Sequence, residues 1–218
     1  MDIKHRIIEI IKSLKISSET KKNTALYEVS RYNDPYLVLI SCILSLRTKD
    51  KITAIASSKL FELGSSPKDM LLLSAKEIET AIYPVGFYRR KSEQILHISR
   101  ILIEEYDSKV PDDLDELLKI KGIGRKTANI VITLGFGKVG LAVDTHVHRI
   151  SNRIGIVSTK TPEKTEFSLK NIVPIEYWKD LNDLFVIHGQ NICAPISPKC
   201  SLCMIIEYCD RVGVGRSR

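Results

Sequence analysis

Four cysteines near the end of the chain have the spacing of metal ligands. Six, two and five residues separate Cys193, Cys200, Cys203 and Cys209. A pair of cysteines two residues apart forms the tight chelating turn of zinc and iron-sulfur sites. Because a zinc ion and a [4Fe-4S] cluster both accept four sulfur ligands, the spacing predicts a four-cysteine metal site and leaves the metal open.

A glycine turn between two apolar segments has the composition of a phosphate-binding site. Gly122 and Gly124 allow the backbone to turn sharply and to approach a ligand closely. The amides that open the following helix, together with Lys121 and Arg125, would bind a nucleic-acid backbone without reading its sequence. An ordinary connection between two helices is the alternative interpretation of this turn.

Lys126 is the candidate nucleophile of the same turn. If Gly124 caps the second helix, Lys126 lies in the first helical turn, where the helix dipole disfavours a cation by up to about 1 kcal/mol. That field, with Arg125 beside it, favours the uncharged amine, whose lone pair is able to attack carbon. A lysine that serves only the solubility of the surface is the alternative.

Asp144 is the second candidate catalytic residue. It stands where a loop becomes a helix, so its simplest role is an N-cap that stabilises the helix by about 1 kcal/mol. A carboxylate fixed by helix amides stays ionised at neutral pH, which suits it to stabilise positive charge that develops on a substrate. We discount a metal on His146 and His148, because residues two apart on a helix point to different faces.

The composition is that of a folded protein with an anionic partner. Hydrophobic residues make up 44% of the 218, which excludes a disordered or collagen-like chain. Lys and Arg outnumber Asp and Glu by 33 to 26, and this net charge of +7 favours nucleic acid or membrane headgroups as partners. The longest apolar stretch, Tyr36 to Leu46, is too short to span a bilayer, and no export signal is visible. We expect a soluble, cytoplasmic protein in which the fifth cysteine, Cys42, is a small buried apolar side chain.

Apolar spacing and capping residues predict an all-α chain of about ten short helices. The apolar residues at helical spacing are Ile7, Ile8, Ile11 and Leu14 in one segment, and Ile95, Ile98, Leu102 and Tyr106 in another. Ser66, Ser74 and Thr161 are predicted to cap the starts of helices. Residues 130–143 are rich in β-branched side chains, but glycines divide them into a helix end and a loop. The tail from Gly213 to Arg218 is expected to fray.

Together these residues resemble the endonuclease III family of DNA glycosylases, within the helix-hairpin-helix superfamily. The likeness covers nearly the whole chain, from about Tyr32 to Cys209. The segments that carry it are Leu44–Asp50, Gly86–Tyr88 with Lys91, the hairpin Gly122–Lys126, Val143–His146, His188 with Gly189, and the cysteine spacing. The order and separation of the hairpin lysine, the Asp-Thr-His sequence and the cysteines make the resemblance specific.

The resemblance implies a two-domain fold with the active site in the cleft between the domains. Residues 28–138 would form a six-helix barrel that carries the hairpin. Residues 1–27 and 139–218 would form a second helical domain, whose four cysteines would hold a [4Fe-4S] cluster. Lys126 and Asp144 would face each other across the cleft, and the protein would act as a monomer.

The activity implied is that of a bifunctional DNA glycosylase and AP lyase of base excision repair. The enzyme would flip a damaged base out of the duplex, because its glycosidic carbon is unreachable inside the stack. Lys126 would then attack C1′ while Asp144 stabilises the sugar, and β-elimination from the Schiff base would nick the strand. The substrates implied are duplexes with an abasic site or with an oxidised or saturated pyrimidine such as thymine glycol. The residues expected to contact DNA are Arg47, Lys121, Gly122, Ile123, Gly124, Arg125, Thr127, His146 and Lys199.

Two departures from the family pattern concern the DNA contacts. Arg47 stands where many members have a glutamine that fills the gap left by the extruded base, so Arg47 would be either that wedge or a plain phosphate contact. Lys121 stands where relatives often have proline. A mismatch-specific glycosylase (G/T or G/U) without lyase activity is the first alternative function. At the position of Lys126, however, some thymine-mismatch enzymes of the superfamily carry tyrosine, and the adenine-mismatch enzymes carry serine. The second alternative is a non-catalytic DNA-binding protein that uses the hairpin alone.

Overall fold

A computed structural model describes residues 2–18 and 34–218 of the chain. Over these two ranges the fold is all-α and contains no β-strand, which confirms the predicted fold class. Internal contacts divide the chain into two compact units. Unit 1 is Met1–Lys21 with Val139–Arg218, and unit 2 is Lys22–Lys138. The expected domain boundary at residues 27 and 28 lies outside the described residues.

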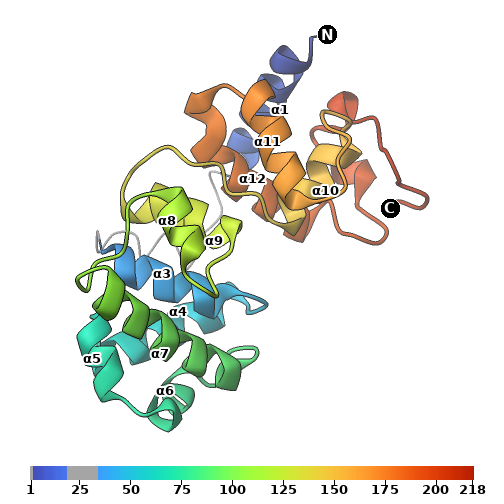
Figure 1. Ribbon diagram of the computed structural model, residues 1–218. Coiled ribbons are helices and arrows are strands. Elements are labelled where there is room, and N and C mark those ends of the chain that lie inside the picture. Colours follow the sequence, from blue (N-terminus) through green and yellow to red (C-terminus); the bar gives the residue numbers. More distant parts are fainter. Residues whose placement is uncertain (1, 19–33) are drawn as a thin grey trace. The chain divides into compact units, whose positions relative to one another are not determined.

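Unit 2 is built around one central helix, α3, which carries the longest apolar stretch of the sequence (Figure 1). Every residue of α3 from Tyr36 to Leu44 is buried, so this stretch is a core helix. The helix starts where Asp34 accepts hydrogen bonds from the amides of Tyr36 and Leu37, with Pro35 in the first turn. No helix in the described ranges combines the length and the apolar character needed to cross a membrane.

The helices of unit 2 follow one another through short connections. They are α3 (Pro35–Ser45), α4 (Asp50–Leu63), α5 (Pro67–Leu72), α6 (Ala75–Ile82), α7 (Tyr88–Glu105), α8 (Leu114–Lys119) and α9 (Arg125–Ile130). Ser66 and Ser74 form capping boxes at α5 and α6, as predicted. The β-branched residues after α9 continue as a π-helical turn, Val131–Gly135, before the chain becomes a loop. The predicted helix end is therefore confirmed.

Helix α7 buries the predicted apolar stripe. Ile95, Ile98 and Leu102 are fully buried, whereas Tyr106 is half-buried and ends the helix as its C-cap. Lys91 lies on the same stripe, four residues before Ile95, and only 4% of its surface is exposed. A lysine at this depth is unusual, because lysine is seldom fully buried unless it is paired.

Unit 1 brings together the N-terminal helix and the last third of the chain. Its helices are α1 (Ile3–Ser18), α10 (Thr145–Arg153), α11 (Pro162–Ile172) and α12 (Trp178–Asn191), with short 3-10 turns at Ile175–Tyr177, Cys200–Leu202 and Ile206–Tyr208. Helix α1 packs against α12. Ile7, Ile11 and Leu14 join the core as predicted, with Ile10 buried where Ile8 was expected. Thr161 caps α11, as predicted.

The expected fraying of the C-terminal tail is wrong. The amide of Arg218 donates to the carbonyl of Pro198 at 2.8 Å, and its own carbonyl accepts from the amide of Ser201 at 3.0 Å. The tail is thereby tied to the segment that carries the cysteines. Fraying was expected because these residues end the chain, whereas their backbone hydrogen bonds are made to a segment about 20 residues earlier in the sequence.

Candidate active site and cysteine pocket

The two glycines of the hairpin differ in what the protein requires of them. Gly122 has φ +103°, which L side chains rarely adopt, and an added Cβ would meet Nε2 of Gln94 at 3.0 Å. Nε2 of Gln94 also donates to the carbonyl of Gly122 at 2.8 Å. Gly124 has φ −95° and caps α9, and an added Cβ there would meet no atom within 4 Å. Only Gly122 is therefore required by the fold itself.

The hairpin exposes its backbone and one of its cations. Lys121, Gly122 and Gly124 are exposed, whereas Ile123 and Thr127 are each only 5% exposed. Ile123 anchors the turn to the core. The side chain of Thr127 faces inward, so the group it can offer to a phosphate is its backbone amide in the first turn of α9. Arg125 is half-buried at the start of that helix.

Lys126 lies in the first turn of α9, as the capping by Gly124 predicts. Its side chain is half-buried, and over the described ranges no hydrogen bond or ion pair occupies its amine. The amine lies close enough to Cys42 of α3 to lower the pKa of that thiol, although burial is the larger effect and raises that pKa to about 12. Cys42 is 2% exposed and is the buried apolar side chain that was predicted. Lys126 is thus a half-buried amine within electrostatic range of the buried thiol of α3.

Asp144 caps α10, as predicted. One of its carboxylate oxygens accepts from the amide of His146 at 2.8 Å and from the amide of Val147 at 2.9 Å. Its carboxylate is half-buried and is held by the positive end of the helix. Asp144 belongs to unit 1 and Lys126 to unit 2, and their facing each other stays a prediction.

The side chain of His146 is engaged within unit 1. Its Nδ1 lies 3.0 Å from Nη2 of Arg149, and its ring packs so closely on Gly189 that a Cβ there would come within 2.4 Å of Nδ1. This contact is the physical reason for a glycine at position 189. His148 instead hydrogen-bonds Oγ1 of Thr165 at 2.6 Å. The two histidines thus have separate hydrogen-bond partners within unit 1.

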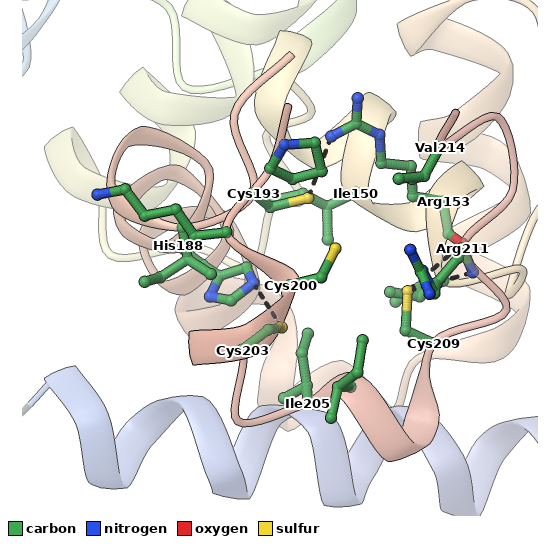
Figure 2. A pocket seen from close by; sticks show the side chains of 15 residues that line it. Ile150, Arg153, His188, Cys193, Cys200, Cys203, Ile205, Cys209, Arg211 and Val214 are labelled. Carbon is green, nitrogen blue, oxygen red and sulfur yellow. Dashed lines mark hydrogen bonds between the residues drawn. The ribbon is translucent and has the colours of Figure 1, made fainter. Parts of the chain in front are cut away.

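The four cysteines meet around one pocket of unit 1. Figure 2 shows Cys193, Cys200, Cys203 and Cys209 with their sulfur atoms toward the same space. All four are free thiols, and the space they line, open solvent at its mouth included, is about 370 Å³. In the part of the chain that the structure describes, no three Cys, His, Asp or Glu side chains are arranged to hold one metal ion.

The pocket is mostly apolar, and three of its nitrogen atoms lie close to sulfur (Figure 2). Nη1 of Arg153 donates to Sγ of Cys193 at 3.4 Å, and the amide of Arg211 donates to Sγ of Cys209 at 3.4 Å. Nε2 of His188 lies 3.6 Å from Sγ of Cys203. Burial raises the pKa of Cys203 to about 11 and raises that of Cys209. Thiolates are therefore costly here without cationic iron or zinc to compensate them.

An all-sulfur donor set surrounded by apolar walls and N–H groups fits an iron-sulfur cluster. Thiolate ligands select zinc or iron-sulfur clusters, and hydrogen bonds to sulfur are part of cluster sites. One tetrahedral zinc ion needs four sulfurs about 2.3 Å from a single centre. The space of about 370 Å³ that the thiols line, open solvent included, leaves room for the larger group. Lys199 also lines this pocket, in the loop between Cys193 and Cys200.

The loop between α3 and α4, residues 46–49, carries Arg47, and we call it the Arg47 loop. Arg47 is exposed, has φ +55°, and holds its guanidinium 5.6 Å from the ring centroid of Phe87. The ammonium of Lys91 donates to the carbonyls of Leu44 and Leu46 beneath the loop. Neither Lys91 nor Gln94 was predicted from the sequence to have a role. Lys91 could have been singled out, because it is a cation at an apolar position of the α7 stripe.

This chain matches a protein-family model, related sequences and solved structures. Residues 40–174 match the family model described as HhH-GPD superfamily base excision DNA repair protein. Endonuclease III of Thermotoga maritima is 49% identical over 188 residues, which are 85% of this chain and 88% of that protein. The structure of a trapped endonuclease III-DNA covalent intermediate superposes with a TM-score of 0.84 at 30% identity, over 97% of both chains. A thermostable thymine-DNA glycosylase reaches 0.81 at 26% identity, over 94% of this chain and 95% of that one.

The fold and the superfamily match define a base excision DNA repair protein. Within that class, the chain belongs to the endonuclease III family. It is a bifunctional enzyme of base excision repair, a DNA N-glycosylase that also acts as an AP lyase. The resemblance noted from the hairpin lysine, the Asp-Thr-His sequence and the cysteine spacing is thereby confirmed.

Proposed function

We propose that this enzyme removes oxidised or saturated pyrimidines, such as thymine glycol, from duplex DNA through a Schiff base on Lys126. The observation that carries the proposal is the state of Lys126, a half-buried amine at the start of a helix with no partner in the described ranges. An amine that no hydrogen bond or ion pair engages is available to attack carbon, as formation of an imine requires.

The reaction proceeds in two stages. Lys126 Nζ bonds to C1′ as the bond from C1′ to the base breaks, and the released base takes up a proton. The C1′–O4′ bond then opens, which leaves an imine between Lys126 and the sugar. Loss of a proton from C2′ expels the 3′ phosphate and nicks the strand. Water finally hydrolyses the imine and regenerates the amine.

Asp144 has the role of stabilising the sugar. Two helix amides hold its carboxylate in one orientation, so the carboxylate need not reorganise when positive charge develops on the deoxyribose. Its cap alone would account for an aspartate at this position. The distinguishing prediction is that Asp144→Asn, which can still accept hydrogen bonds from the amides, loses activity with little loss of stability.

The hairpin and nearby cations are proposed to bind the DNA backbone. The open space at Gly124 supports this assignment, because nothing inside the protein requires a glycine there and a phosphate could approach its amide. Lys121 and Arg125 add charge to the exposed backbone of Gly122 and Gly124. Ile123 and Thr127 would contribute through their amides, and His146 and Lys199 are proposed contacts from unit 1.

We propose that Cys193, Cys200, Cys203 and Cys209 hold a [4Fe-4S] cluster. The cluster would supply the four Fe–S bonds that tie the segment from Cys193 to Cys209 together, with Lys199 presented to phosphates. Support comes from the all-sulfur donor set, the space between the thiols and the N–H groups that point at sulfur. No step of the base-removal reaction passes through the cluster.

Trapping with borohydride tests the nucleophile. We expect wild-type enzyme, incubated with a duplex that contains thymine glycol or an abasic site and then reduced, to give a covalent protein-DNA band on a denaturing gel. Lys126→Ala should lose the band and retain DNA binding, because the imine cannot form. Lys121→Ala serves as the matched control, since it removes a neighbouring hairpin cation and should still be trapped.

Three outcomes would contradict the proposal. If Lys126→Ala is trapped at the wild-type level, the nucleophile lies elsewhere. If wild-type enzyme releases thymine from a G/T mismatch but forms no trapped species, it is a mismatch glycosylase without lyase activity, the alternative suggested by the thymine-DNA glycosylase fold. A protein that binds the duplex and releases no base would be the non-catalytic alternative.

A further inference from the structure

We propose that Lys91 is a positioning residue that holds the Arg47 loop rigid, so that Arg47 fills the gap left when a damaged base is extruded. The proposal rests on the function proposed above, because extrusion precedes attack by Lys126. Arg47 itself is exposed and free to meet DNA, whereas Lys91 is 4% exposed and can act only through the loop.

All three donors of the Lys91 ammonium are directed at the same short segment. Nζ donates to the carbonyl of Leu44 at 2.8 Å, to the carbonyl of Leu46 at 2.6 Å and to Oγ1 of Thr48 at 3.2 Å. An ammonium has three donors and no acceptor, so this arrangement uses it completely. These bonds join the end of α3, the residue before Arg47 and the residue after it. The loop cannot move without breaking at least one of them.

Stability does not account for a lysine at this position. Lys91 occupies the buried stripe of α7, and among the described residues no carboxylate pairs with it. Burial lowers its pKa to about 8, which measures how poorly the site tolerates the charge. A methionine would fill the same space without that cost, although it would leave the carbonyls of Leu44 and Leu46 without the ammonium as donor. The charge is therefore kept for the groups it contacts, and all of them belong to the Arg47 loop and the end of α3.

The Arg47 loop has the strain and close packing expected of a rigid wedge. Arg47 has φ +55°, a conformation that costs a non-glycine residue about 1 kcal/mol or more and persists only where the surroundings impose it. An added Cβ on Gly86 would lie 2.7 Å from the carbonyl oxygen of Arg47, and the amide of Gly86 donates to Oγ1 of Thr48 at 3.2 Å. The ring of Phe87 supports the Arg47 guanidinium from the same turn.

Helix α7 also fixes the hairpin, one turn after Lys91. Gln94 donates to the carbonyl of Gly122, and residues three apart lie on one face of a helix. One helix of unit 2 therefore holds both the Arg47 loop and the proposed phosphate site at a constant separation. Unstacking a base costs a few kcal/mol. A side chain that wedges into the stack must therefore be held rigidly relative to the residues that bind the DNA backbone.

The test compares two single-turnover rates measured on the same preparation of Lys91→Met. Excision of thymine glycol requires extrusion of a stacked base, whereas cleavage at a preformed abasic site has no base to unstack. We expect the excision rate to fall by about tenfold or more and the abasic cleavage rate by less than about threefold, since each factor of ten corresponds to about 1.4 kcal/mol. Arg100→Met removes one exposed charge from the same helix and should change neither rate.

Thr48→Val provides a second variant if Lys91→Met folds poorly. It removes one of the three acceptors of the ammonium and the partner of the Gly86 amide, and it should shift the ratio of the two rates in the same direction by a smaller factor. Fluorescence of 2-aminopurine beside the lesion, measured in a Lys126→Ala background, should show less unstacking when Lys91→Met is added. This spectroscopic readout is independent of chemistry.

Equal losses of both rates would overturn the proposal, because a merely structural lysine or an Arg47 that only contacts phosphate affects both substrates alike. Unchanged rates would overturn it as well. Failure of the proposed function is recognised separately. Lys91→Met should still be trapped by borohydride on abasic DNA near the wild-type level, whereas an error in the nucleophile appears as trapping of Lys126→Ala.

Discussion

The Arg47 loop of unit 2 and the cysteine segment of unit 1, residues 193–209, are held in place by different means. Lys91 and Gly86 fix the Arg47 loop through hydrogen bonds and packing within the protein. The cysteine segment is made of short 3-10 turns that surround a pocket of four thiols. The first should keep its shape in the bare polypeptide, and the second should depend on the cofactor proposed for it. The Arg47 loop is thus expected to be ordered without a cofactor, whereas the cysteine segment is expected to need one.

Removal of a cluster ligand is the strongest way to test this difference. We expect Cys203→Ser to lose absorption near about 400 nm and to destabilise unit 1 by several kcal/mol, since metal-site binding energy is folding energy. Hydrogen exchange should rise throughout residues 193–218 and stay unchanged in the Arg47 loop.

Cys42→Ala is the matched control, because Cys42 is a buried thiol that lines no part of the pocket. It should keep the absorption. A colourless wild-type protein with one zinc ion per chain would contradict the cluster, and equal exchange in the two regions of Cys203→Ser would contradict the distinction between them.

The pH dependence of stability tests the self-supporting loop. The unfolded chain holds the Lys91 proton up to about its ordinary pKa of 10.5, whereas the folded protein loses it near 8. The unfolded state therefore binds more protons between these values, and stability rises with pH. From about pH 7 to about pH 9.5, wild type should gain about 2 kcal/mol relative to Lys91→Met.

Urea unfolding at the two pH values measures this gain, and an NMR titration of the lysine side chains gives the midpoint directly. Arg100→Met should follow wild type at both pH values. A constant difference between wild type and Lys91→Met would mean that the ammonium titrates normally and that the loop is not built on a desolvated charge.

Substitution of the two hairpin glycines should have the smallest effects. One substitution should change mainly the stability of the protein and the other mainly its affinity for DNA. Gly122→Ala should cost about 1–2 kcal/mol of stability, because an L residue is strained at its φ of +103° and meets Gln94. Gly124→Ala should leave the free energy of unfolding within about 0.5 kcal/mol of wild type. It should instead weaken binding to an abasic duplex, by about fivefold or more.

Thermal unfolding and fluorescence anisotropy measure the two quantities on the same samples. The outcome that counts against a phosphate at the Gly124 amide is unchanged affinity in Gly124→Ala. Loss of stability in that variant would show that the glycine serves the turn after all.

Local features of the sequence predicted much of the architecture. Serine caps at α5 and α6, the Asp144 cap and the apolar stripe of α7 depend on residues a few positions apart, and all of them are found in the structure. The role of Lys91 could not be predicted in this way. Its acceptors lie more than 40 residues away, and only the tertiary fold brings them to its ammonium. The tie between Arg218 and Pro198 escaped prediction for the same reason.

Because Cys42 is buried, any reactive thiol of the native protein should come from the four cysteines of the pocket and report on the cofactor proposed there. Burial makes this thiol unreactive, since its pKa is about 12 and only 2% of it is exposed. The other four cysteines of the chain line the pocket. If the pocket cysteines hold the proposed cluster, a maleimide assay should detect no thiol in loaded native protein, and any thiol that becomes reactive when the cluster is lost should belong to the pocket.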